Sequence, residues 1–125
     1  MTKLKKFCFS ILFCLLILVA CLMNLSPLPS DPMTNFDKLV HCAMFFCLSG
    51  LVYFENTNRL KQSVKLRRIF WGTLVFPILF GGIIELIQNY LSVYRTGDWL
   101  DFLWNSIGAT LAFGLALYIN SLKRP

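Results

Sequence analysis

Four long apolar segments constrain this chain more than any other feature. They run over about residues 7–25, 36–54, 69–91 and 99–119 of the 125-residue chain. A helix needs about 20 mainly apolar residues to cross a bilayer. Only 14% of the residues are charged and 57% are hydrophobic, which is too little charge to cover a soluble domain of this size. The sequence therefore predicts an all-α fold, a four-helix transmembrane bundle that forms one membrane domain over residues 1–125.

The positive charges predict how the bundle is oriented. If the N-terminus lies in the cytoplasm, every one of the twelve Lys and Arg residues except Lys38 and Arg95 falls on the inner side. Such an excess of basic residues on the cytoplasmic side is typical of membrane proteins. We therefore expect both termini to be cytoplasmic. The net charge of +6 then belongs to the flanks of the spans, and we expect no nucleic acid as a partner.

The first segment contains a competing signal. Leu18-Val19-Ala20-Cys21 resembles the lipobox of bacterial lipoproteins, which is cleaved before the cysteine. The apolar run continues past Cys21 to Leu25, so we expect a retained helix instead. The five cysteines lie in apolar segments without a CxxC pair, and we interpret them as buried free thiols.

Two further features concern helix packing. Pro77 lies inside the third segment and should kink the helix or open its hydrogen-bond ladder. Small residues allow close helix approach, and we expect this at Gly81, Gly82, Gly108, Ala109, Ala112 and Gly114.

Polar residues inside these segments are the main functional signal, because ionisable groups are costly in lipid and are usually retained for a purpose. At 1.5 Å per residue, His41, Glu85 and Asn105 lie about 20–24 Å above the inner ends of their helices. They should therefore share one level in the outer part of a core that is about 30 Å thick. Other polar residues lie three or four positions away in the sequence from these residues, which places the polar residues of each helix on one face. We expect these faces to meet.

The same residues carry a family pattern: Asp37-Lys38-x-x-His41, Glu85-x-x-Gln88, Arg95, Asp101-x-x-x-Asn105 and Gly108. In their order and spacing they resemble the VanZ-like family of small bacterial membrane proteins. The resemblance covers about residues 37–114 and implies a multi-pass protein of the bacterial cytoplasmic (inner) membrane. The family is named for a protein linked to resistance to the glycopeptide teicoplanin, so the resemblance implies a role in the cell envelope and a connection to antibiotic resistance.

We predict a polar pocket that opens to the outer surface and binds an amphiphilic ligand. A lipid-linked cell-wall precursor or a lipoglycopeptide could place its tail among the helices and its head against charged groups. Arg suits phosphate or carboxylate because its donors bind in pairs. The residues expected to line this pocket are Asp37, Lys38, His41, Glu85, Gln88, Arg95, Asp98, Asp101 and Asn105.

An enzyme acting on a lipid head group is the first alternative. Glu85 or Asp101 could serve as general base with His41 as its acid partner. Ser92, Thr96 and Ser106 are present, but none lies in a recognisable nucleophile motif. A metal variant would use Asp37, His41 and Glu85, yet no HExxH-type spacing supports it, and we expect neither a metal nor a cofactor.

The second alternative is purely structural. In that case the carboxylates pair with Lys38, Arg95 and His41, while Gln88 and Asn105 form hydrogen bonds between helices. Interhelical polar bonds need no further function, so the sequence leaves the three explanations open.

Overall fold

The computed structural model describes residues 3–22, 34–58, 61, 63–90 and 99–123, and all regular elements in this part of the chain are helical. A short helix α1 (Lys3–Lys6) precedes α2 (Cys8–Leu22) and α3 (Thr34–Asn56). The third long helix is continuous through α4 (Leu66–Ile69), η1 (Phe70–Val75) and α5 (Phe76–Tyr90). The last helix is α6 (Trp99–Lys123).

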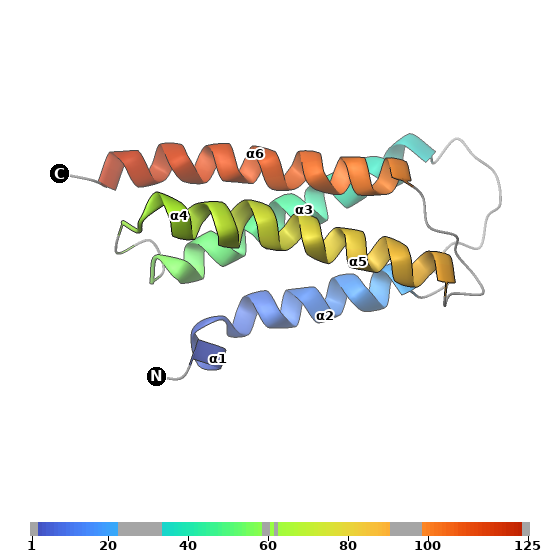
Figure 1. Cartoon of the computed structure of the whole chain (residues 1–125), viewed down its shortest axis with the longest axis horizontal. Coiled ribbons are helices and arrows are strands. Elements are labelled where there is room, and N and C mark those ends of the chain that lie inside the picture. The colour runs from blue at the N-terminus through green and yellow to red at the C-terminus, as the bar shows by residue number, and fades with distance from the viewer. Residues whose placement is uncertain (1–2, 23–33, 59–60, 62, 91–98, 124–125) are drawn as a thin grey trace.

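Figure 1 shows α2, α3, the continuous helix from α4 to α5, and α6 side by side, with successive helices running in opposite directions. Helix α1 and the end of α6 therefore lie at the same end of the molecule, and α3 and α6 run parallel. Three helices are long and apolar enough to cross a membrane: Lys38–Asn56, Leu66–Tyr90 and Trp99–Lys123. The described apolar part of α2, Cys8–Cys21, is shorter, and residues 23–25 of the predicted first span lie outside the described residues.

Helix boundaries differ from the predicted spans mainly at the end of the molecule where α1 and the end of α6 lie. The loop predicted to reach Arg68 ends earlier, because α4 begins at Leu66 and takes Arg67 and Arg68 into its first turn. Helix α6 continues to Lys123 rather than ending near residue 119. Basic residues are tolerated here because long side chains at a helix end can reach the polar interface.

The predicted disturbance at Pro77 is present as a π-helical turn. Residues Phe70–Val75 form this turn directly before it, and the amide of Phe76 donates to the carbonyl of Trp71, five residues back. Proline has no amide hydrogen to donate to the carbonyl four residues earlier, so a widened turn is a common way to accommodate it. Pro77 itself is fully buried in the bundle.

The apolar core joins α2 to α3 and α5. Its buried members include Ile17, Phe45, Leu48 and Ile84. Many large apolar side chains point outward instead, among them Leu79, Leu111 and Trp71, which suits a surface that faces lipid rather than water. The cysteines are free thiols as predicted, but the expectation that all are buried is wrong, because Cys8 and Cys47 are exposed on this outer surface.

Helices α3 and α6 make the closest backbone approach, at Gly108. A Cβ atom there would lie 3.0 Å from the carbonyl carbon of Cys42 and from the amide nitrogen of Phe46, and would overlap the Cys42 carbonyl oxygen. Ala109 and Ala112 are buried beside it. The prediction for Gly114 is wrong: it is exposed, and a Cβ there would meet nothing within 4 Å.

Candidate functional site

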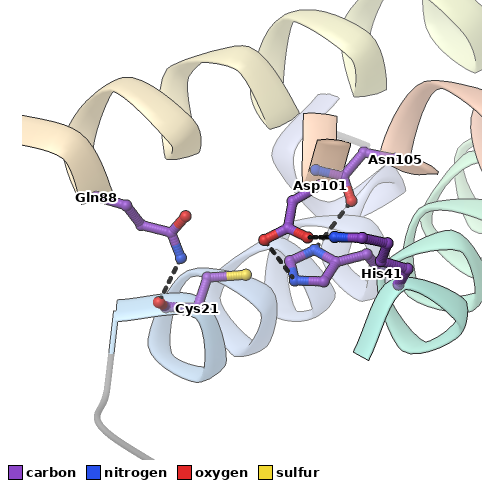
Figure 2. A network of polar contacts seen from close by, with 6 residues as sticks. Cys21, His41, Gln88, Asp101 and Asn105 are labelled. Atoms are coloured by element: carbon purple, nitrogen blue, oxygen red, sulfur yellow. Dashed lines mark hydrogen bonds and ion pairs between the residues drawn. The ribbon is translucent and has the colours of Figure 1, made fainter. Parts of the chain in front are cut away.

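The core of the candidate site lies between the parallel helices α3 and α6. Lys38 and His41 are three residues apart on α3, and Asp101 and Asn105 are four apart on α6, so each pair shares one helix face. Lys38 Nζ lies 3.3 Å from Asp101 Oδ1, and His41 Nε2 lies 3.7 Å from Asp101 Oδ2. His41 Nδ1 lies 3.1 Å from Asn105 Oδ1. Figure 2 shows these groups converging between the two helices.

Local structure explains why these side chains can meet. The backbone contact at Gly108 brings α3 and α6 together one turn away from Asn105, so short side chains span the gap. Asp101 lies in the first turn of α6, where the partial positive charge of the helix N-terminus stabilises a carboxylate. The carboxyl group of Asp101 therefore lies near both the N-terminus of its own helix and Lys38.

The contact with Asn105 determines the tautomer of His41. An amide carbonyl oxygen only accepts hydrogen bonds, so Nδ1 of His41 carries the hydrogen and donates it to Asn105 Oδ1. In the neutral ring Nε2 then carries the lone pair. This lone pair faces Asp101 Oδ2, at 3.7 Å. Two electron-rich atoms face each other, an arrangement that favours a proton or a metal cation between them.

A third helix contributes Glu85. This residue lies on α5 and its side chain is only 4% exposed. One carboxylate oxygen of Glu85, one ring nitrogen of His41 and one carboxylate oxygen of Asp101 all lie within 4.8 Å of one another. We call His41, Glu85 and Asp101 the three-helix cluster. Of the three residues expected at one level, His41 thus lies close to both Glu85 and Asn105.

Gln88 forms a hydrogen bond between helices, as the structural alternative expects. It is on α5, three residues after Glu85, and its Nε2 donates to the carbonyl oxygen of Cys21 on α2 at 2.6 Å. Cys21 is 1% exposed. The amide of Gln88 therefore ties α2 to α5, as Figure 2 shows. Its Oε1 is buried and has no hydrogen bond within the described part of the chain.

Three of the predicted pocket residues cannot be placed. Arg95, Asp98 and the side chain of Asp37 lie outside the described residues. The metal variant with Asp37, His41 and Glu85 therefore stays a prediction. The described residues bring together a related set, in which Asp101 lies with His41 and Glu85.

One buried carboxylate was not predicted from the sequence: Glu55, at the C-terminal end of α3. Its oxygens accept hydrogen bonds from the Phe9 amide (3.1 Å), the Ser10 amide (2.8 Å) and the Ser10 hydroxyl (2.5 Å). These amides belong to the first turn of α2, whose donors have no partner within the helix. The sequence did contain a signal for this contact. No capping side chain precedes α2, so the acceptor for its first-turn amides had to come from another part of the chain.

A second contact that was not predicted attaches Val64, just before α4, to Asn120 on α6. Asn120 Oδ1 accepts from the Val64 amide at 2.9 Å, and Asn120 Nδ2 donates to the Val64 carbonyl at 3.0 Å. The two bonds attach the start of the third long helix to the end of α6. An open cavity of about 500 Å³ lies at this end, lined by Ser63, Val64, Lys65, Arg67, Arg68 and Trp71. Its lining residues lie at the start of the third long helix, whereas Glu85 of the three-helix cluster lies near the end of that helix.

Taken together, the helices and the cluster define a class: an all-helical membrane protein with an ionisable group from each of three helices buried against the others. The chain belongs to the VanZ/LLP1 family, whose model matches residues 4–120. This confirms the resemblance seen in the sequence.

One curated relative is an uncharacterized protein of Schizosaccharomyces pombe, 28% identical over 102 residues. The match covers 81% of this chain and 57% of the relative, so the chain spans little more than half of the relative's length. No solved structure matches the chain.

Proposed function

We propose that this protein binds the polar head of an amphiphilic cell-envelope ligand at the outer end of a four-helix transmembrane bundle. The proposal has all four long helices crossing the bacterial cytoplasmic membrane, with both termini in the cytoplasm. A lipid-linked cell-wall precursor or a lipoglycopeptide fits this description. The link to glycopeptide resistance is part of the proposal, because such drugs act on those precursors.

Lys38 is the observation that carries the proposal. It is a cation with only 9% of its surface exposed, on a helix long and apolar enough to span a membrane. Burying a Lys in such a place is costly unless it has an anionic partner. Asp101 provides one in the protein, at 3.3 Å. A phosphate or carboxylate of a ligand head group would be attracted by the same charge.

The test uses the full-length protein, extracted in mild detergent and examined by native mass spectrometry. We expect a lipid with a phosphate-bearing head group to remain bound to the wild type. Lys38→Gln should lose it while retaining its melting temperature, because Gln keeps a donor toward Asp101. Lys65→Gln is the matched control, since Lys65 is an exposed lysine at the opposite end. Equal lipid retention by Lys38→Gln and the wild type would contradict the proposal.

A second candidate function rests on His41. Its Nδ1 hydrogen is held by Asn105, so its Nε2 is positioned to accept a proton, as a general base does. Glu85 and Asp101 lie within reach to assist. In this case the protein hydrolyses a lipid head group with activated water. Purified protein with a diphosphate lipid would release phosphate, and His41→Gln would abolish that release without loss of lipid binding.

A purely structural cluster makes a different prediction. Glu85→Gln would then lower the melting temperature, and any phenotype would follow the amount of protein in the membrane. A functional site instead loses binding or phenotype at normal abundance.

A further inference from the structure

The three-helix cluster has the composition of a metal site. His41, Glu85 and Asp101 come from α3, α5 and α6, and their exposed fractions are 1%, 4% and 4%. One donor atom from each lies within 4.8 Å of the other two. Two carboxylates and a neutral imidazole carry two negative charges, which match a divalent cation.

The orientation of His41 supports metal binding independently. Histidines that bind metals almost always donate their second ring N–H to a carboxylate or carbonyl group. Here Nδ1 donates to Asn105 Oδ1 at 3.1 Å, and this contact turns the Nε2 lone pair toward Asp101 Oδ2. Asn105 is fully buried, and its Nδ2 has no hydrogen bond within the described residues. The side-chain carbonyl of Asn105 therefore orients the His41 ring, although the amide hydrogens of Asn105 form no hydrogen bond within the described residues.

In this arrangement each oxygen of Asp101 faces a different side chain. Oδ1 lies 3.3 Å from Lys38 Nζ, whereas Oδ2 faces His41. Lys38 thus leaves the oxygen on the His41 side for an ion. Pairing of a metal-binding carboxylate with a second group is common, since ligating carboxylates are themselves hydrogen-bonded.

We propose that His41 Nε2, Asp101 Oδ2 and one oxygen of Glu85 bind a single divalent transition-metal ion, Zn²⁺ or Mn²⁺. Imidazole with carboxylates suits these ions, whereas Ca²⁺ and Mg²⁺ prefer oxygen ligands alone. Ligand distances of about 2.0–2.2 Å at tetrahedral angles put two donors of one ion about 3.4 Å apart. Donor atoms that lie within 4.8 Å of one another would therefore have to approach by up to about 1.4 Å on binding the ion.

Three protein ligands leave one coordination position open, which is the pattern of exchangeable rather than closed structural zinc sites. Water or an anionic oxygen of a ligand would occupy it. The inference goes beyond the proposed function and stands without it, because metal content is measured in the absence of any lipid.

The test is metal analysis of the full-length protein, stripped with EDTA in detergent and then dialysed against Zn²⁺ or Mn²⁺. We expect one ion per chain and a higher melting temperature with the ion than without it. X-ray absorption of the Zn²⁺ form should show only nitrogen and oxygen neighbours. A sulfur shell would assign the ion to the free cysteines and overturn the proposal, as would an ion content near zero.

Variants separate the site from general stability. Asn105→Ala leaves all three ligands in place but removes the acceptor that orients His41, and we expect an affinity about 10–100-fold lower. Glu85→Gln should bind more weakly still. Glu55→Gln is the matched control, because Glu55 is a buried carboxylate at the other end of α3, and it should bind as the wild type does. Unchanged affinity in Asn105→Ala and Glu85→Gln, or an equal loss in Glu55→Gln, would refute the assignment.

Discussion

Replacement of Gly108 by alanine tests the link between helix packing and the candidate site. The added Cβ atom would lie 3.0 Å from two backbone atoms of α3 and would overlap the carbonyl oxygen of Cys42. Carbon atoms in ordinary contact lie about 3.5–4.0 Å apart, so α3 and α6 must separate by about 1 Å. Backbone atoms cannot rotate away as a flexible side chain does, so the whole seam has to move.

The separation acts directly on the site. His41 precedes Cys42 in the chain, and Asn105 is one turn before Gly108, so the same displacement stretches their 3.1 Å hydrogen bond. At about 4 Å the bond is lost. Overpacking costs about 1–3 kcal/mol, and a buried polar group left unsatisfied costs about 1–3 kcal/mol more. The better helix propensity of alanine returns about 0.5–1 kcal/mol, so we expect a net loss of about 2–4 kcal/mol.

Gly114→Ala is the matched control for this experiment. It makes the same chemical change on the same helix, six residues further on, where a Cβ meets nothing within 4 Å. Unfolding in mixed detergent micelles should give the control the stability of the wild type or slightly more. If Gly108→Ala and Gly114→Ala had equal stability, the close approach of α3 and α6 would be wrong.

Three further predictions concern the inner end and the orientation. Glu55→Ala leaves two first-turn amides of α2 without their acceptor and should lower the free energy of unfolding by about 1–3 kcal/mol. Glu55→Gln keeps an acceptor and should lower this free energy less. An unchanged unfolding midpoint for the alanine variant would refute the role of Glu55 as acceptor for α2. Asn120→Ala removes both hydrogen bonds to Val64 and should speed tryptic cleavage of the inner loop in detergent, while Asn120→Asp, which keeps the acceptor for the Val64 amide, should be intermediate. Single cysteines at Asn58 and Ser121 in a cysteine-free background should react with a membrane-impermeant reagent only after the cells are lysed, since both residues are exposed and the proposed topology puts them on the cytoplasmic side. Labelling of intact cells at either position would reverse the proposed topology.

The sequence by itself determined the helical class and the level of the polar residues. Apolar length is a local property, and bilayer thickness converts it into helices without knowledge of their neighbours. Helical rise then placed His41, Glu85 and Asn105 at similar heights. The structure describes three helices of spanning length and brings polar side chains of three helices together.

Only the tertiary structure decided which groups pair. Spacing of three or four gives a face but not the direction in which that face points, so the sequence did not reveal that Gln88 on α5 donates to Cys21 on α2. Gly108 and Gly114 are both glycines of α6, but only Gly108 lies where the backbones of two helices are in contact. Glu55 and Asn120 act on segments far away in the chain. Such partners depend on the rotation of each helix about its own axis, and this rotation is fixed by packing between helices, which one sequence does not reveal.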